Sequence, residues 1–585
     1  MLLRLSGVRV VSLAMEPHCI SFREIPDTTK IFATFLDDFE QVAKYFAHPP
    51  DIEGVLAAAR NIHLDAGIRK GVVEVLREQN RGFAPGQKIE AQTEKNLDRL
   101  ANGAVAIVTG QQVGLFGGPA YSLYKAITAA SYAAELTRRG VDAIPIFWLA
   151  TEDHDLAEIN HAAWNTREGL AEFKLQGDES SEGRRVGEIA LGDGVTALVA
   201  EAAGKLEGSD AERIANALRE SYAPGETYGS AFGKLLTRLL EGRGIVFIDP
   251  LDARLHRLSA ATYRRALDES DALRDLLIAR SKELEDRGFH AQVKVASEST
   301  LLFYNVDGVR HPLRNRNGKF YAAHASFTLD ELRAAIDATP DAFTPNVLLR
   351  PIVQDTLLPT AAYVGGPAEI AYMAQTEVVY KNLLGRMPAI LPRASFTVIE
   401  APVDHMLKKF DLTFRDVMRG RQHVRSRMEA KFLPAALSEK FEADEKALKE
   451  LLAGYREPIQ KLDASLAGSL ELAQQKILHQ FATLKGKAGR AENLRSGVLD
   501  RKEKMIFDAL YPHHELQERT ISGLPWLASY GAEFLDGLSH VSPIADALVT
   551  ESNDNSSLAH MGPDEPNPID EFVAACANQH HVVTF

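Results

Sequence analysis

Only two cysteines, Cys19 and Cys576, occur in this chain of 585 residues, and they lie far apart. So few cysteines exclude a disulfide framework and a four-cysteine zinc site within one chain, and they fit a reducing cytoplasm. Because no run of 18 apolar residues occurs, the sequence predicts no membrane-spanning helix. Basic residues are also in the minority, with 66 Lys and Arg against 80 Asp and Glu. The net charge of −14 argues against nucleic acid as the main partner.

The two ends of the chain differ in composition from the rest. Residues 1–14, MLLRLSGVRVVSLA, superficially resemble a signal peptide, but Arg4 and Arg9 interrupt the apolar part and no small-residue cleavage site follows. We expect a disordered extension or a misassigned start, with Met15 as the initiator, and secretion is the alternative. Residues 546–585 are polar and rich in turn formers, so we expect a disordered tail.

The length of the chain is too great for a single hydrophobic core. We expect a core domain over residues 15–400, which carries an insertion at about 165–345. A helical domain is expected over residues 401–545. The stretch before residue 100 has apolar residues at helical spacing and is expected to cover one side of the core.

A strand, a glycine-rich loop, a helix and a second strand are expected between Ala104 and His161. Their ranges are 104–109, 110–118, 119–138 and 143–150. Such a βαβ unit has two parallel strands, and it predicts an α/β fold with a doubly wound and mostly parallel sheet. Ligands of these sheets bind beyond the carboxyl ends of the strands, where the glycine loop and an acidic cluster both fall.

The same local pattern returns between Asn346 and Gln375. A strand at 360–364 precedes Gly365 and Gly366, and Pro367 begins a helix that continues to about residue 384. Gly-Gly-Pro-Ala therefore begins a helix twice in the chain. We interpret the two units as halves of one sheet whose glycine turns meet at a common pocket, and chance similarity of two turns is the alternative. Further strands are expected at 244–249 and 388–400.

The glycine turns are candidates for anion binding, because glycines let backbone N–H groups approach a ligand and a helix N-terminus favours negative charge. Neither turn has the G-x-G-x-x-G dinucleotide pattern or a Walker A pattern. The alternative is that the glycines only allow tight turns. The nucleotide-binding candidates are Gly110, Gly114, Gly117, Gly118, Lys125, Gly365 and Gly366.

The cluster Glu152-Asp153-His154-Asp155 follows the second strand and can act in two ways. Carboxylates can hold a cationic amine and orient a histidine that accepts its proton, which makes Asp153, His154 and Asp155 the catalytic candidates. Alternatively, His154, Glu158 and His161 share one face of a helix and could bind zinc or iron. A capped helix start is the structural alternative. We predict no bound metal.

Two arginines near the same edge, Arg350 and Arg393, can bind carboxylate or phosphate through bidentate contacts. Other polar residues around them complete the candidates for substrate binding. The full set is Gln111, Gln112, Trp148, Asn160, Arg350, Gln354, Asp355, Tyr363, Glu369, Tyr372, Gln375 and Arg393.

A heptad seam is expected at about residues 437–484. Apolar residues there recur alternately four and three positions apart, which predicts a coiled coil. Pro458 should kink or split its helix. A helical hairpin folded on its own chain is the alternative, and a coiled coil that also joins two subunits is compatible with both.

Four long motifs carry a resemblance to a known family. They are VTGQQVGLFGGPAYSLYKA, PIFWLATEDHDLAEIN, NVLLRPIVQDTLLPTAAYVGGPAEIAYMAQ and NLRSGVLDRKEKM. In this order they resemble the bacillithiol biosynthesis cysteine-adding enzyme family over roughly Met15 to Ser539. The resemblance implies a Rossmann-like core with inserted connecting segments and a C-terminal coiled-coil domain that forms a homodimer.

The same resemblance implies an activity, the joining of the cysteine carboxyl group to the amine of glucosaminyl-malate in the last step of making a low-molecular-weight thiol. Amide synthesis from a free carboxylate needs activation, so we expect ATP. The layout is similar to that of class I aminoacyl-tRNA synthetases, although His-x-Gly-His and Lys-Met-Ser-Lys-Ser are absent. We expect small-molecule substrates and neither nucleic acid nor membrane as a partner. The alternatives are a metal-dependent hydrolase at Glu152–His161 and a coiled-coil scaffold without catalysis.

Overall fold

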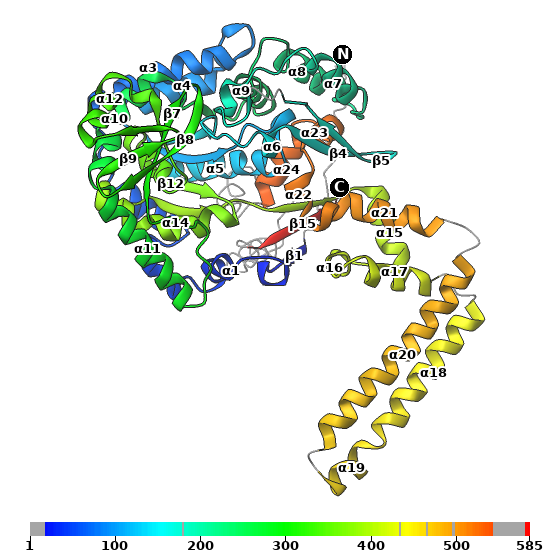
Figure 1. Cartoon of the computed structure of the whole chain (residues 1–585). Helices are drawn as coiled ribbons and strands as arrows, with labels where there is room; N and C mark the ends of the chain where they lie inside the picture. The colour runs from blue at the N-terminus through cyan, green and yellow to red at the C-terminus, as the bar shows by residue number, and fades with distance from the viewer. Residues whose placement is uncertain are drawn as a thin grey trace, which may run out of the picture.

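The computed structural model describes residues 18–177, 181–431, 435–463, 466–493, 498–541 and 579–584. The expected extension at residues 1–14 and most of the expected tail lie outside these ranges. The chain forms a large main body from which a long helical arm projects (Figure 1). No helix in the described part of the chain is long and apolar enough to cross a membrane.

The main body is built on a five-stranded parallel sheet in the order β13-β12-β2-β3-β6. The strands are β2 (Val105–Gln111), β3 (Ala143–Leu149), β6 (Val246–Ile248), β12 (Thr360–Gly365) and β13 (Ala389–Pro392). Counted along the chain, this order is 5-4-1-2-3, the order of a Rossmann fold. The predicted doubly wound sheet is confirmed. The chain order reverses between β2 and β12, the point at which such sheets bind ligands.

The central strands are apolar without alternation because both faces of the sheet are covered. Every residue of β3 is buried. Ile146 and Trp148 pack into one hydrophobic core, whereas Phe147 and Leu149 pack into another on the opposite face. A fully buried parallel strand has this sequence pattern.

The helices predicted before residue 100 form, but they cover both faces of the sheet and not one side as expected. Val72 and Leu97 pack in the same core as Trp148, whereas Val55 and Ala58 pack with Ile107 on the opposite face. α1 (Lys30–Asp37), α2 (Ile52–Ala59), α3 (Ala66–Phe83) and α4 (Ala91–Ala101) precede β2 in the chain. α5 (Tyr121–Arg138) follows β2 and packs against β2 and β3. α14 (Pro367–Leu383) follows β12 in the same way. Each of the two Gly-Gly-Pro-Ala turns therefore leads from a strand of this sheet into a helix.

The predicted insertion is divided into two parts by β6, which belongs to the core sheet as the 244–249 pattern indicates. The first part contains the hairpin β4 (His161–Thr166) and β5 (Gly169–Lys174), then α7 (Val195–Gly204), α8 (Ala211–Ser221) and α9 (Tyr228–Leu239). The second part begins with α10 (Ala253–Asp268) and α11 (Ser270–Asp286). Its antiparallel sheet comprises β7 (Ser299–Val306), β8 (Val309–Arg316), β9 (Lys319–Ala322), β10 (Ala325–Phe327) and β11 (Phe343–Pro345). α12 (Leu329–Ala338) lies between β10 and β11, and α13 (Arg350–Leu357) leads to β12.

The arm is a helical hairpin of α18 (Ala435–Ala453), α19 (Arg456–Leu462) and α20 (Ala467–Asn493). It follows α15 (Ala401–Phe410), α16 (Phe414–Met418) and α17 (Arg421–Ala430). The rings of Phe441 and Phe481 lie 5.4 Å apart across the hairpin. Pro458 falls in the short α19, so the predicted split is confirmed. The hairpin on its own chain is the form observed within one subunit.

After the arm, the chain returns to the main body. α21 (Val498–Leu510), α22 (Gln517–Thr520), α23 (Leu524–Tyr530) and α24 (Glu533–Val541) pack against β5, β4, α8 and α5. These four helices fall within the predicted 401–545 domain, and they pack against the main body.

The end of the chain also joins the main body. β15 (His580–Thr584) lies between β1 (His18–Ile20) and β14 (Phe396–Ile399), so the predicted disorder is wrong for these residues. Cys19 in β1 is disulfide-bonded, and Cys576 lies outside the described residues. The low cysteine count did not predict this bond.

Candidate active site between the two halves of the sheet

A cavity of about 660 Å³ opens beyond the carboxyl ends of β2 and β12. Gly110, Gln111 and Gln112 line it from the first half of the sheet, and Gly366 and Glu369 line it from the second. The predicted meeting of the two glycine turns at one pocket is thus confirmed by their positions, although these turns are more than 250 residues apart in the chain.

Lys125 of α5 holds the two turns together. Its Nζ donates to the Gly110 carbonyl at 2.8 Å and to Gln111 Oε1 at 2.9 Å, and it forms an ion pair with Glu369. Glu369 in turn accepts from the Gly366 N–H at 2.7 Å and from the Tyr363 hydroxyl at 2.6 Å. Burial opposes ionisation of Glu369, but Lys125 and the Gly366 N–H hold its pKa below the usual value. Lys125 therefore acts as a clamp between the two turns. Its three N–H donors already have protein partners, so none is left for the predicted contact with nucleotide.

An anionic wall forms where β3 ends. Gln112 Nε2 donates to Asp153 Oδ2 at 2.8 Å and to Glu158 Oε2 at 2.7 Å, and the His154 backbone N–H donates to Asp153 Oδ1 at 2.7 Å. Burial alone would raise the pKa of Asp153, but the hydrogen bonds from His154 and Gln112 outweigh it and hold that pKa well below its usual range. Asp153 is therefore a fixed negative charge facing the cavity.

Arg310 of β8 closes this wall from the inserted sheet. Its guanidinium lies 3.7 Å from the centre of the Phe303 ring, donates to Thr344 Oγ1 and the Pro345 carbonyl, and lies 3.1 Å from His154 Nδ1. His154 Nδ1 also lies 3.4 Å from Asp153 Oδ1, so the ring is positioned between the Arg310 guanidinium and the Asp153 carboxylate.

The remaining residues of the acidic motif lie away from the cavity. Asp155 accepts from the Glu158 N–H at 3.1 Å and caps α6 (Leu156–Ile159), so its predicted catalytic role is wrong and the helix-cap alternative describes it. The helical face expected for a metal does not form, because α6 has only four residues and His161 already lies in β4. Within the described ranges, no three His, Cys, Asp or Glu residues are grouped to hold a metal ion. Asn160 is buried behind α6 and does not line the cavity.

Arg350 lines the opposite side with three aromatic residues. Its guanidinium donates to the hydroxyls of Tyr363 and Tyr372, at 3.3 Å each, and lies 5.9 Å from the Trp148 ring centre. All four residues contact the cavity, as predicted for substrate binding.

Three other predicted substrate ligands lie behind this layer. Gln354 accepts from Arg350 at 3.0 Å and donates to Asp355 at 2.9 Å. Gln375 instead binds the backbone N–H and carbonyl of Val293. These side chains support the cavity wall and do not reach the space itself, so their predicted role in binding substrate directly is incorrect.

Most of the predicted glycines shape the first turn without lining the cavity. Gly117 and Gly118 have φ values of 84° and 67°, a backbone conformation that residues with a side chain rarely adopt. A Cβ on Gly114 would meet the Gly118 Cα at 2.9 Å. Gly365 ends β12 beside Pro392. Of the seven candidates for nucleotide binding, only Gly110, Gly366 and the clamp Lys125 line the cavity.

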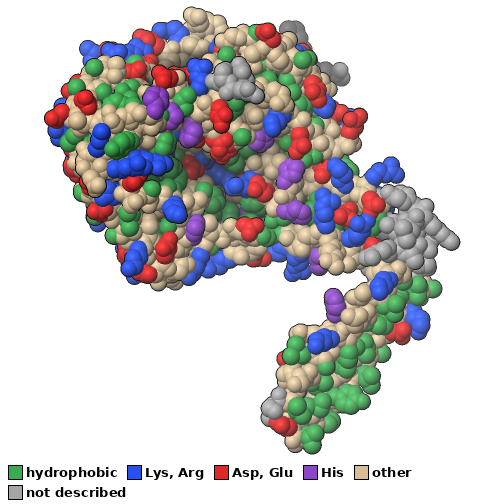
Figure 2. Space-filling model, viewed as in Figure 1, with side chains coloured by type: hydrophobic (Ala, Val, Ile, Leu, Met, Phe, Trp, Pro, Cys, Tyr) green, Lys and Arg blue, Asp and Glu red, His purple; other side chains and the backbone are tan. Residues whose placement is uncertain are grey.

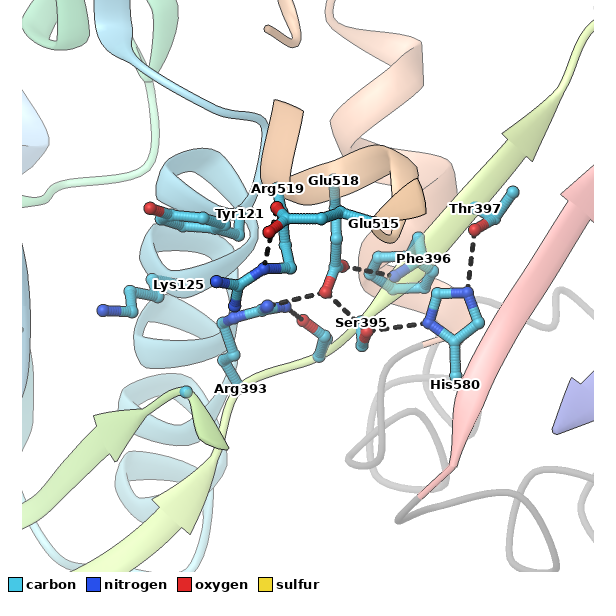
Figure 3. Close-up of polar contacts among 12 residues, drawn as sticks. Tyr121, Lys125, Arg393, Ser395, Phe396, Thr397, Glu515, Glu518, Arg519 and His580 are labelled. Atoms are coloured by element: carbon cyan, nitrogen blue, oxygen red, sulfur yellow. Dashed lines mark hydrogen bonds and ion pairs between the residues drawn. The ribbon is translucent and has the colours of Figure 1, made fainter. Parts of the chain in front are cut away.

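Arg393 lines the cavity from the end of β13 and is held from behind (Figure 3). It lies 5.2 Å from the Tyr121 ring centre and donates to Glu518 at 2.6 Å. Glu518 is fully buried, and it also accepts from Ser395 Oγ and the Phe396 N–H. Burial opposes its ionisation, but the pair with Arg393 lowers the pKa of Glu518.

The C-terminal strand reaches this ion pair through His580. Ser395 Oγ lies 2.8 Å from His580 Nδ1, and Thr397 Oγ1 lies 2.8 Å from His580 Nε2. Because ionised Glu518 can only accept, Ser395 donates to it and must accept from His580 Nδ1–H. Burial lowers the pKa of His580 to about 4, so the imidazole is neutral. Figure 3 shows this chain of contacts from β15 to the cavity arginine.

Two family models match the sequence almost end to end. Residues 15–394 match "Bacillithiol biosynthesis BshC, N-terminal Rossmann-like domain", and residues 396–546 match "Bacillithiol biosynthesis BshC, C-terminal coiled-coil domain". The chain belongs to the BshC family. The matched ranges of BshC stop before β15.

Several curated relatives are named "Putative cysteine ligase BshC". The chain is 40% identical to the one from Koribacter versatilis over 524 residues, which cover 90% of this chain and 97% of the relative. It is 34% identical to the one from Solibacter usitatus, covering 89% and 96% of the two chains. The relative from Salinibacter ruber is 32% identical, covering 87% and 93%.

Sequence reasoning did not select five residues that line the cavity of this BshC-family chain: Tyr121, Glu152, Arg310, Arg314 and Arg519. Tyr121 and Glu152 lie directly beside the predicted glycine turn and acidic candidates, so this position in the sequence was the available signal. The three arginines come from β8 and α22, and no local pattern connects those segments with the turns.

Replacing the clamp lysine should destabilise the protein. Lys125→Met leaves Glu369 as a buried charge without its partner, so we expect a loss of about 3–5 kcal/mol in the free energy of unfolding. Urea denaturation measures it. The double variant Lys125→Met/Glu369→Gln should recover part of the loss, whereas Lys461→Met in an exposed ion pair serves as the control and should change little. A loss below about 1 kcal/mol for Lys125→Met would show that the clamp is not needed.

Proposed function

We propose that this protein is an ATP-dependent ligase that joins the carboxyl group of L-cysteine to the amine of glucosaminyl-malate through an amide bond. The observation that carries the proposal is the distribution of charge in the cavity. The carboxylates of Asp153 and Glu158 line it together with the guanidinium groups of Arg350 and Arg393. A substrate with both an amine and carboxylates fits such walls, and the names of the relatives support a cysteine ligase.

The reaction needs an activated carboxyl group, which ATP supplies. A cysteine carboxylate oxygen attacks a phosphorus atom of ATP. Attack at the γ-phosphorus expels ADP and forms an acyl phosphate, whereas attack at the α-phosphorus expels pyrophosphate and forms an acyl adenylate. The substrate amine then attacks the carbonyl carbon, so that a C–N bond forms while the C–O bond to the phosphate breaks. Arginines near the activated group stabilise the negative charge that develops on these oxygens.

The binding roles follow from the contacts in the cavity. Asp153 stays ionised and holds the substrate ammonium group near His154. Arg350 is held by hydrogen bonds to the Tyr363 and Tyr372 hydroxyls, and its guanidinium binds a substrate carboxylate. Arg393 is fixed by Glu518 and supplies a second positive charge at the turn that begins α14.

Purified protein should form the amide from cysteine, glucosaminyl-malate and ATP, and mass spectrometry detects the product. Asp153→Asn should lower kcat/KM by about 100-fold, because the ammonium group loses its charged partner. Asp65→Asn is a matched control at a surface helix cap, where asparagine caps equally well. No amide with any nucleotide would refute the proposal and favour the scaffold alternative.

We further propose that the arm pairs with the arm of a second copy. Leu451, Leu462, Leu472 and Leu484 are 60%, 80%, 60% and 56% exposed. Figure 2 shows hydrophobic side chains along the arm. An apolar face of this kind on a hairpin with heptad spacing is complementary to an identical face.

Charges on the arm should separate the two copies. Ile477→Glu/Leu484→Glu places two carboxylates seven residues apart on an exposed apolar face, so we expect a monomer by analytical ultracentrifugation. Gln475→Glu/Gln480→Glu adds the same charge at exposed polar positions and should leave the dimer intact. A wild-type monomer at micromolar concentration would contradict the proposal.

A further inference from the structure

Glu152 is a buried carboxyl group that contacts the cavity and has no role in the contacts described so far. It follows β3 directly, its side chain is nearly excluded from solvent, and it lines the cavity next to Asp153. Oε1 of Glu152 has no hydrogen-bond partner among the described residues. Burying an oxygen without a hydrogen-bond partner costs folding free energy. Such an atom beside a cavity therefore indicates a group that works by gaining or losing a proton.

A second atom without a partner lies directly behind it. His256 of α10 is 2% exposed, and its Nε2, which lies 3.5 Å from Glu152 Oε1, also makes no hydrogen bond within the described ranges. On the other side of the ring, His256 Nδ1 lies 3.0 Å from the Tyr263 hydroxyl. The hydroxyl can donate or accept, so it permits either tautomer of the imidazole.

One hydrogen bond between these two groups satisfies both atoms in either state. When Glu152 is ionised, His256 carries its proton on Nε2 and donates to Oε1, while Nδ1 accepts from Tyr263. When the other carboxyl oxygen of Glu152 is protonated, Nε2–H still donates to Oε1, so the imidazole keeps its proton and its tautomer. A small closure of the 3.5 Å gap makes this hydrogen bond.

The charges around the pair suit a proton acceptor near neutral pH. Burial raises the pKa of Glu152 to about 7, with positive charges at Arg310, Arg185 and Arg350 opposing the rise and Asp249 adding to it. Burial lowers the pKa of His256 to about 4, and the charges of Arg185, Asp341 and Asp252 also act on it. The histidine is therefore neutral in both states, and the carboxyl group is the one that titrates.

We propose that Glu152, supported by His256, is the base that removes the proton from the substrate amine. The inference rests on the proposed amide ligase. The substrate arrives as R–NH₃⁺ on Asp153, one N–H proton passes to the Glu152 carboxylate while Oε1 keeps its hydrogen bond from His256, and R–NH₂ attacks the activated carbonyl carbon. Glu152 is then a neutral acid bonded to His256 Nε2, and it returns its proton to solvent after the product leaves.

The two carboxylates of the motif thereby have different tasks. Asp153 accepts several hydrogen bonds and stays ionised, so it binds the cation but is a weak base. Glu152 lacks such bonds and takes up a proton readily. Pairs of carboxyl groups whose surroundings separate their pKa values are a common arrangement for acid–base work.

The pH dependence of kcat/KM tests the role of Glu152. The wild-type value should fall tenfold per pH unit below about pH 7, because the protonated acid cannot accept the amine proton. Glu152→Gln keeps the shape and should lose about 100-fold or more at pH 7.5. Asp65→Asn, which changes a carboxyl group at a surface helix cap, should retain the acidic limb. If Glu152→Gln keeps more than half of the wild-type value and the same limb, the inference is wrong.

His256 acts through Glu152 and is tested as a positioning residue. His256→Phe removes the donor that stabilises ionised Glu152, so the acidic limb should move to higher pH. His256→Gln retains an N–H donor and should bring the limb back toward the wild-type position. If the acidic limb lies at the same pH in the wild type, His256→Phe and His256→Gln, then His256 does not support the base.

Calorimetry separates this inference from the proposed activity. Titration calorimetry measures the binding of glucosaminyl-malate alone at pH 6, where Glu152 is mostly protonated. Buffers of different ionisation enthalpy then give the number of protons released. The bound ammonium ion should drive Glu152 to release close to one proton to the buffer, and Glu152→Gln should release none. Proton release without amide synthesis would refute the ligase but retain Glu152 as the amine's proton site. Amide synthesis without this difference in proton release would refute Glu152 as the base that accepts the proton of the amine.

Discussion

The ion pair between Lys125 and Glu369 is the interaction on which the cavity depends. It joins α5, which follows the first strand of the sheet, to α14, which follows the fourth. The same two side chains bind the Gly110 carbonyl and the Gly366 N–H, so both turns are fixed by one buried contact. Breaking such a pair leaves an uncompensated charge in a site of low polarity. A doubly wound sheet places the turns at one edge, and this pair sets how they face each other.

Segments far from the sheet complete the walls of the cavity. The inserted sheet brings Arg310 to His154, and α22 brings Glu518 to Arg393. The C-terminal strand adds His580 behind Ser395, beyond the ranges that match the family models. Arg310, Arg393 and Lys125 are therefore each held at the cavity by a partner from another part of the chain. Fixed groups of this kind need little reorganisation during a reaction.

The local patterns in the sequence were sufficient for the sheet but not for the whole site. Apolar runs and Gly-Gly-Pro-Ala turns predicted β2, β3, β6, β12 and the helices α5 and α14 at nearly their observed bounds. Spacing misplaced His161, because α6 ends after one turn and β4 begins. Asp155, Gln354 and Gln375 are polar residues in the expected stretches that bind protein atoms instead of facing the cavity. Arg310 and His580 are brought in by tertiary packing, which single-sequence patterns do not record.

A crystal structure with glucosaminyl-malate in the absence of ATP would test the central claim most directly, because no reaction can then consume the ligand. The account predicts electron density in the cavity between Gln112 and Gly366. The amine should lie between Asp153 and Glu152, and a malate carboxylate should lie at Arg350 or Arg393. Density at another surface, with the space between the two glycine turns occupied only by water, would contradict it.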